Sequence, residues 1–375
     1  MIMKIRLKKL LKRLVREETD PLITVKISRD ALLHNLAQFQ KIKPENKMAP
    51  VLKSNAYGHG LLEVASILEN RADFFVIDSY FEAQALRNEG IKTPLLIIGY
   101  VRPETIASSR LKNISYAISS LDTLFAIKSP CIIHLKIDTG MHRQGILPDE
   151  LDQAIAHVKK NRNIGLEGIC SHLADADSAN SAYTEKQISL WNSVVEKTKK
   201  EFPSIKYVHL SNSHGNAFAK KISANVSRLG IGLYGLADMK DLDLKPVLEM
   251  RTILTNVKRI KKGDPVGYNN TFIAPKDMTL ATIPIGYYEG LDRRLSNKGW
   301  VKIKGTEVPI VGRISMNITT LDVSAIKDAK IGDEVQVISP IQTDKNSICS
   351  MTRIVDAISY EMVVSIPKEI KREII

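Results

Sequence analysis

Short β-rich runs alternate with amphipathic helical stretches over more than two hundred residues of this chain, beginning at about residue 22. Parallel strands need long crossover connections, usually helices, so alternation sustained over this length predicts a parallel sheet. With about eight such units, a closed (β/α)8 TIM-type barrel is the favoured form of an α/β fold. The predicted strands lie at 22–27, 48–53, 74–78, 95–99, 114–118, 132–137, 166–170, 207–210 and in a run after Asn225. Predicted helices include 30–41, 60–70, 79–89, 150–160 and 185–201.

Past about residue 251 the pattern changes. Segments 300–304, 308–311, 317–323 and 334–338 are β-rich and are separated by Gly, Pro and Asp/Asn turns, with one helix candidate near 350–359. This predicts a mainly-β C-terminal domain. A chain of 375 residues with 44% apolar content can bury one large and one smaller core. We therefore expect an N-terminal extension at 1–20, an α/β barrel at 21–250 and the mainly-β domain at 251–375.

The net charge of +13 is concentrated at the N-terminus, where residues 1–16 contain seven basic side chains and no acid. Leucines in this segment recur on one helical face, which predicts a basic amphipathic helix. Such a helix can contact an anionic membrane surface, bind nucleic acid or pack on its own protein. Nothing else in the chain supports nucleic-acid binding, so peripheral membrane contact of residues 1–16 is the alternative kept open.

The three cysteines, Cys131, Cys170 and Cys349, are widely spaced and belong to no Cys-x-x-Cys or His/Cys cluster. They indicate neither a disulfide framework nor a zinc site, so no metal is expected. No apolar run reaches membrane-spanning length, and no secretory signal is evident. These features predict a soluble, cytoplasmic protein.

Residues 51–60 place Lys53 between an apolar strand-like run and a polar turn bounded by glycine, with Tyr57 four residues later. An amine that can form a Schiff base and a phenol that can bind phosphate are the two handles that pyridoxal phosphate (PLP) requires. Taken alone, a lysine at a strand end is more often a solvated surface charge.

Two other motifs admit different interpretations. Asp138-Thr139-Gly140 is also the aspartic-protease triplet, but that interpretation needs a second triplet or a much shorter chain that dimerises. Gly230, Gly232 and Gly235 form a Gly-x-Gly-x-x-Gly pattern. A dinucleotide site would need it in an early βαβ unit with an acid about twenty residues later, and the chain has Thr255 there. A phosphate cradle of backbone amides after a barrel strand fits better.

Segments 51–60, 134–145, 226–235, 283–290 and 312–317 together resemble motifs of the alanine racemases, and further matches run along nearly the whole chain from about residue 22. The resemblance implies PLP as cofactor. It gives Lys53 the role of holding PLP covalently and of acting as an acid/base on one face of the substrate α-carbon. It also places Tyr57 on the phosphate.

The same resemblance assigns roles around the cofactor ring. Arg228 would contact the pyridine nitrogen and keep it unprotonated, which favours reprotonation over transamination. His209 would orient that arginine, and His172 would hydrogen-bond the catalytic tyrosine. The remaining implied ligands are Asn212 at the cofactor; Ser213 and the amides of Gly230 and Ile231 on the phosphate; Arg143 near the substrate carboxylate; and Lys136, carbamylated in many members, positioning Arg143.

Racemisation in place needs a second acid/base on the opposite face of the α-carbon. The resemblance puts Tyr287 in that role, contributed by the partner subunit of a homodimer, with the Met316 amide near the substrate carboxylate. Three departures put substrate choice in doubt. Asn317 stands where an aspartate is common, Tyr288-Glu289 replaces Ala-Asp, and no tyrosine follows Tyr360-Glu361 to narrow the pocket.

The resulting hypothesis is a PLP-dependent racemase that interconverts L- and D-alanine by a two-base mechanism and supplies D-alanine for peptidoglycan. A serine or broad-specificity amino-acid racemase is the nearest alternative. A PLP decarboxylase of the same barrel type should lack the 134–145 and 283–290 motifs. A non-catalytic PLP-binding protein would resemble the barrel alone.

Overall fold

The computed structural model describes residues 20–177, 182–239 and 241–375. The basic helix predicted at 1–16 lies outside the described residues. Among those that are described, no helix is long and apolar enough to cross a membrane.

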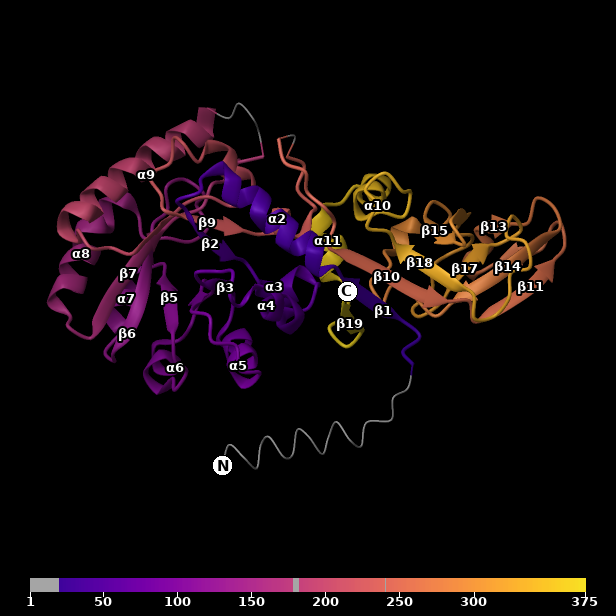
Figure 1. The fold of residues 1–375 in the computed structure, drawn as a ribbon, viewed down its shortest axis with the longest axis horizontal. Helices are drawn as coiled ribbons and strands as arrows, with labels where there is room; N and C mark the ends of the chain where they lie inside the picture. Colours follow the sequence, from indigo (N-terminus) through magenta and orange to yellow (C-terminus); the bar gives the residue numbers. More distant parts are fainter. Residues whose placement is uncertain (1–19, 178–181, 240) are drawn as a thin grey trace.

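Eight parallel strands form the barrel that the alternation predicts (Figure 1). The six middle strands form one continuous sheet in chain order. The first strand of the eight pairs with the eighth. Two hydrogen bonds join this strand pair to the two edges of the six-stranded sheet: the Leu52 amide donates to the Val76 carbonyl at 2.8 Å, and the Asn225 amide donates to the Val208 carbonyl at 3.0 Å. The strands are β2 (Lys47–Pro50), β3 (Phe75–Ile77), β4 (Leu95–Ile97), β5 (Ile114–Ile118), β6 (Cys131–Lys136), β7 (Ile164–Cys170), β8 (Tyr207–His209) and β9 (Val226–Leu229).

The predicted helices form around this barrel, each beginning and ending near its expected bounds. They are α2 (Arg29–Ile42), α4 (Leu61–Leu68), α5 (Tyr80–Asn88), α8 (Leu151–Lys160) and α9 (Ala182–Glu201), joined by the shorter α3 (Lys53–Tyr57), α6 (Pro103–Ser108) and α7 (Leu121–Ala126). Helix α5 begins with a capping box, in which Ser79 and Glu82 accept each other's backbone amides. This cap matters for the site, because Glu82 also accepts the Ser54 amide at 2.7 Å.

The strand predicted at 22–27 forms, but it does not join the barrel. This strand, β1 (Thr24–Ile27), lies between β10 (Leu248–Ile253) and β19 (Lys371–Ile374) in the sheet of the second domain. Figure 1 shows it beside the end of the chain. The full order of that sheet is β16 (Thr306–Pro309), β15 (Trp300–Ile303), β18 (Glu334–Ile338), β10, β1, β19. The first strand of the chain therefore belongs to the sheet of the second domain, and the first strand of the barrel is β2.

The second domain is mainly β, as predicted. A three-stranded sheet contains β11 (Asn256–Ile260), β14 (Met278–Ile283) and β17 (Thr319–Asp322), and β12 (Pro265–Val266) pairs with β13 (Phe272–Ile273). The single helix expected near 350–359 is wrong, because two helices occupy this region: α10 (Ile348–Val355) and α11 (Ser359–Val364). Asp356 adopts a left-handed φ of 51° at the end of α10, which turns the chain between them.

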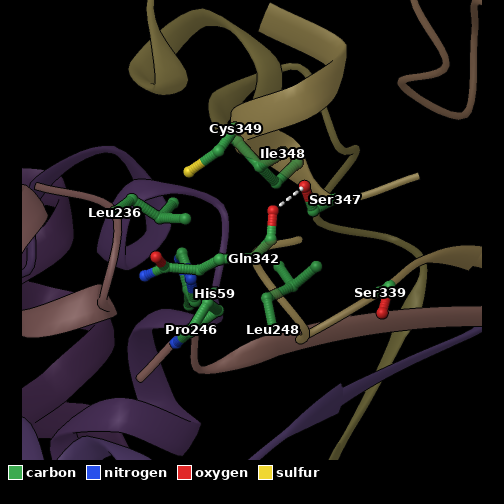
Figure 2. A pocket seen from close by; sticks show the side chains of 9 residues that line it. All are labelled: His59, Leu236, Pro246, Leu248, Ser339, Gln342, Ser347, Ile348 and Cys349. Carbon is green, nitrogen blue, oxygen red and sulfur yellow. Dashed lines mark hydrogen bonds between the residues drawn. The ribbon is translucent and has the colours of Figure 1, made fainter. Parts of the chain in front are cut away.

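One hydrophobic core runs from the barrel into the second domain. A cavity of about 10 Å³, just large enough for one water molecule, lies at their junction, and Figure 2 draws the residues that line it. His59 and Leu236 line it from the barrel side, and Gln342 and Cys349 line it from the second domain. Gln342 donates to the carbonyls of Gly235 and Leu244, so polar contacts also join the two domains.

Candidate active site

A cavity of about 250 Å³ opens at the carboxyl ends of the barrel strands, where barrel enzymes carry their chemistry. Its lining contains four basic side chains, Lys53, Lys136, Arg143 and Arg228, and no carboxylate among the described residues. The remaining lining residues are Val51, Tyr57, Val76, Ile98, Cys170, His172, Asn212, Ser213, Gly230 and Tyr360. A cavity of this composition suits an anionic ligand with an apolar part.

Lys53 lies at the start of an unusual turn. The four residues that follow it, 54–57, all have left-handed φ angles between 52° and 56°, a conformation that costs about 1–2 kcal/mol per non-glycine residue. Several contacts hold the turn: the Glu82 carboxylate accepts the Ser54 amide, the Asn55 side chain accepts the Leu61 amide at 2.9 Å, and Arg372 donates to the Gly58 carbonyl at 2.9 Å. Strain maintained in this way marks functional segments.

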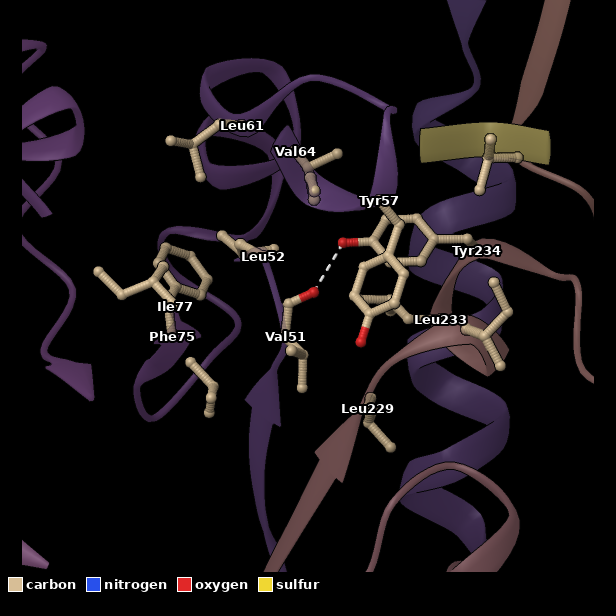
Figure 3. Packing of buried hydrophobic residues seen from close by; sticks show 14 of the residues in the cluster. Val51, Leu52, Tyr57, Leu61, Val64, Phe75, Ile77, Leu229, Leu233 and Tyr234 are labelled. Carbon is tan, nitrogen blue, oxygen red and sulfur yellow. Dashed lines mark hydrogen bonds between the residues drawn. The ribbon is translucent and has the colours of Figure 1, made fainter. Parts of the chain in front are cut away.

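The turn directs Tyr57 toward a group of backbone amides on the opposite side of the cavity. Ser213 Oγ accepts the amides of Gly230 and Gly232 at 3.0 and 3.1 Å. A Cβ on Gly230 would lie 3.0 Å from the Tyr57 hydroxyl, so a side chain there would fill the space between them. Figure 3 shows Tyr57 beside Tyr234, whose hydroxyl donates to the Val51 carbonyl at 2.9 Å. Hydroxyls and backbone amides that converge on one space can form a cradle for a phosphate.

Arg228, on β9, forms the floor of the cavity and is 7% exposed. Its Nη2 donates to the carbonyls of Ser171 and Leu210 at 2.6 and 2.7 Å. Its Nη1 lies 3.2 Å from His209 Nδ1, and its Nη2 lies 3.3 Å from His172 Nδ1. Burial lowers the pKa of both histidines well below the usual value, so each is a neutral acceptor. No carboxylate pairs with Arg228 among the described ion pairs, and its charge therefore remains available to a ligand.

Lys136 and Arg143 line the cavity together, and Lys136 Nζ donates to Gln144 Oε1 at 3.1 Å. Burial lowers the pKa of Lys136, and the charges of Arg228, Arg143 and Lys53 lower it further. A lower pKa increases the fraction of neutral amine, which is the form that reacts with CO₂ to give a carbamate. The position of Lys136 therefore favours the modification that the resemblance implies.

The expectation that no C-terminal tyrosine narrows the pocket is wrong. Tyr360, at the start of α11, lines the cavity with its ring 5.6 Å from the ring of Tyr57. Burial raises the pKa of Tyr360 to about 12, so the phenol stays protonated and can donate. The sequence contained this tyrosine, but its approach to Tyr57 depends on how the second domain folds back over the barrel.

Most of the other predicted residues come together here. Asn212 and Ser213 line the cavity, His209 lies behind Arg228, and Ile231 follows Gly230 in the cradle loop without lining the cavity. Tyr287 and Met316 lie outside the cavity lining and are 43% and 55% exposed on the second domain. They are neighbours, since the Tyr287 amide donates to the Ser315 carbonyl at 3.1 Å.

Another exposed tyrosine, Tyr268, shares this region and was missed in the sequence analysis. It is 67% exposed, and the ideal Cβ position of the preceding Gly267 lies 3.3 Å from the Arg313 amide. Gly267, Asn269 and Asn270 have left-handed φ angles of 75°, 60° and 49°. The available signal was the Gly-Tyr-Asn-Asn string, since Gly and Asn are the residues that adopt such angles most readily.

Asn317 and Glu289, two of the departures from the family pattern, contact each other. Asn317 Nδ2 donates to Glu289 Oε1 at 2.7 Å, while Glu289 Oε2 accepts the Gly286 amide at 2.8 Å. The pair ties the turn that contains Tyr287 to the segment that contains Met316. An aspartate at 317 would place two carboxylates at this distance, so the asparagine and the glutamate fit each other.

We therefore expect Asn317→Asp to destabilise this region by about 1.5–3 kcal/mol at neutral pH, the cost of losing a hydrogen bond to a charged group. Adding Glu289→Gln should restore most of the loss, because an amide can then donate to the new carboxylate. Denaturant unfolding of both single variants and the double variant measures the coupling. Additive losses in the double variant would contradict a direct contact.

The residues present fit PLP on the structural ground that a phosphate cradle, a strand-end lysine and an unpaired buried arginine line one cavity. Among the described residues, no group of His, Cys, Asp and Glu side chains could hold a metal ion.

Comparison with known proteins gives consistent matches over nearly the whole chain. The model for the N-terminal domain of alanine racemase matches residues 27–238, and the model for its C-terminal domain matches residues 247–374. Alanine racemases from Methanococcus maripaludis and Clostridium tetani are each 34% identical over 365 residues, covering 93% of this chain and 98% and 94% of theirs.

Solved structures agree with these matches. The alanine racemase of Clostridium difficile 630 superposes with a TM-score of 0.87 at 30% identity and covers 96% of this chain and 97% of that chain. The alanine racemase of Bacillus anthracis with bound L-Ala-P has a TM-score of 0.87 at 27% identity, with 96% of each chain covered.

Proposed function

The chain belongs to the alanine racemase family, and from this premise we propose that it interconverts L- and D-alanine with PLP as cofactor. The observation that carries the proposal is the single cavity in which Lys53, the Tyr57/Ser213/Gly230 cradle and Arg228 meet without a carboxylate. When bound, PLP withdraws electrons from the substrate and acidifies the α-proton.

In this proposal the cradle binds the phosphate through Tyr57, Ser213 and the amides of Gly230 and Ile231, while Asn212 supports the same end. Lys53 holds the cofactor and then moves a proton to or from one face of the α-carbon. Arg228 donates toward the pyridine nitrogen. Because a guanidinium keeps its proton, the ring nitrogen is left unprotonated and side reactions such as transamination are disfavoured.

Recognition of the substrate follows from the basic rim of the cavity. Arg143 offers a fixed fork of donors to the substrate carboxylate. We propose that a carbamate on Lys136 positions Arg143, and that the Met316 amide of a partner subunit completes the carboxylate site.

The opposite face of the α-carbon needs a second acid/base. Among the described residues, the lining of this cavity contains Tyr57 and Tyr360 as its only phenols, both at the phosphate end. We propose a homodimer in which an exposed tyrosine of the partner's second domain supplies this group, hydrogen-bonded to His172. Sequence register favours Tyr287. Tyr268 is the rival, because its strained turn and greater exposure are typical of a side chain presented to another surface.

The physiological role that we propose is the supply of D-alanine for peptidoglycan. The cavity is only about 250 Å³ in volume, which favours a small side chain, but one extra small group is excluded by only about 1–3 kcal/mol, or roughly 10–200-fold. Racemisation rates across a panel of L-amino acids, with growth of a D-alanine auxotroph carrying this gene, test the proposal. A preference of more than about tenfold in kcat/KM for serine or a basic amino acid would overturn the alanine assignment.

A further inference from the structure

A line of buried polar side chains continues from Arg228 into the barrel, away from the cavity. His209 Nε2 lies 2.8 Å from His134 Nδ1, and His134 Nε2 lies 3.5 Å from Glu167 Oε2. Glu167 also accepts the Ser115 hydroxyl at 2.6 Å and the Lys206 ammonium at 3.2 Å. His134 and His209 are 1% and 0% exposed, so this line crosses the barrel interior.

The direction of donation along this line follows from its two ends. Arg228 can only donate, and an ionised Glu167 can only accept. His134 must therefore carry its proton on Nε2, facing Glu167, and accept at Nδ1. His209 must then carry its proton on Nε2 and accept the Arg228 N–H at Nδ1. Each imidazole is restricted to one tautomer by a charged group at either end.

The protonation states agree with this direction. Burial lowers the pKa of His134, and burial lowers that of His209 well below its usual value. The hydrogen bond from His134 is the largest of the causes that lower the pKa of Glu167 to about 2. At neutral pH the carboxylate of Glu167 is ionised and both imidazole rings are neutral, as this direction of donation requires.

The surrounding backbone is shaped to hold the His134 ring. The pairing of β6 with β7 is irregular between Ile133 and His134, and a Cβ on Gly168 would lie 2.7 Å from His134 Nδ1. Phe74 and Tyr207 pack against the same ring, at centroid distances of 6.0 and 5.7 Å. These contacts enclose the ring with Nδ1 toward His209 and Nε2 toward Glu167.

We propose that Glu167 and His134 are positioning residues, which act through His209 to hold the Arg228 guanidinium in the orientation that faces the cofactor ring. This inference rests on the proposed function only for the identity of the ring that Arg228 contacts. Without the carboxylate, His134 can place its proton on Nδ1, and His209 must then move its own proton to Nδ1, where it opposes an Arg228 N–H. Arg228 would then turn away.

The test uses full-length protein with its cofactor and records ¹⁵N NMR of the histidine rings, assigned with single histidine variants. In the wild type, His134 and His209 should both show a protonated Nε2 and an unprotonated Nδ1. Glu167→Leu should give mixed tautomers at both, and kcat for alanine should fall roughly 5- to 150-fold with little change in KM, the effect of an unsatisfied buried donor. Glu167→Gln keeps an acceptor for His134, so most of the protein should again have Nε2 protonated at both histidines.

Glu249→Leu is the matched control, because Glu249 is also a carboxylate with little exposure, paired with Arg251 in the second domain. It should leave both tautomers unchanged. A wild-type His209 that carries its proton on Nδ1 overturns the proposal without any variant, even if Glu167→Leu does not fold. Unchanged tautomers in a folded Glu167→Leu protein also overturn it. If the wild type does not racemise alanine, the proposed function fails. The tautomer measurement still tests whether Glu167 and His134 position Arg228.

Discussion

Lys53→Ala protein should fold and yet lose both the visible absorption of the lysine-bound cofactor and its racemase activity. The loss should be at least about 10²–10⁴-fold in kcat, the usual contribution of a positioned acid/base, with covalent attachment lost in addition. Folding should survive because the Lys53 side chain makes no hydrogen bond or ion pair among the described contacts, and the strained turn is held through residues 54–58. Absorption spectra, circular dichroism and racemisation assays measure the three properties.

Lys47→Ala provides the matched control. Lys47 is the first residue of β2, the strand that leads to Lys53, and it pairs with Asp73 at 3.8 Å. Its removal should leave the absorption and the activity near the wild-type level. Full activity in Lys53→Ala without an added amine would contradict the assignment of Lys53 as the residue that holds the cofactor.

A phenylalanine at the second acid/base should abolish racemisation while leaving the cofactor bound. Tyr268→Phe and Tyr287→Phe each remove one hydroxyl from an exposed side chain, so neither should reduce folding stability measurably. We expect one of the two to lower kcat by about 10²–10⁴-fold and the other to change the kinetics far less. Wild-type rates in both variants would contradict the assignment of either Tyr268 or Tyr287 as the base.

Mixing experiments then test whether the tyrosine acts across a dimer. Equal amounts of Lys53→Ala protein and the inactive tyrosine variant, allowed to exchange subunits, should regenerate about a quarter of wild-type activity, since half of the dimers are hybrids with one intact site each. Mixing the same Lys53→Ala protein with the other tyrosine variant serves as the comparison. An active monomer, or no recovery after demonstrated exchange, would count against the shared site.

The local elements of this fold could be predicted because their causes are local. Period-2 and period-3.6 patterns determine which residues can share a buried face, and the Ser79/Glu82 cap is complete within four positions of the chain. The position of β1 could not be predicted in this way. An isolated strand followed by a helix looks the same whether it joins the barrel or the other sheet, and its partners β10 and β19 are distant in sequence.

By itself the sequence determined the α/β alternation and the chemistry at the strand ends, including the lysine, the arginines and the glycine-rich cradle, because these are contiguous strings. Only the tertiary structure decided that Tyr360 reaches the cavity, that Asn317 and Glu289 form one contact, and that Glu167 and His134 lie in line with Arg228. These relationships depend on how separate segments pack. Packing is set by shape and by hydrogen-bond satisfaction across the whole core, which no local pattern encodes.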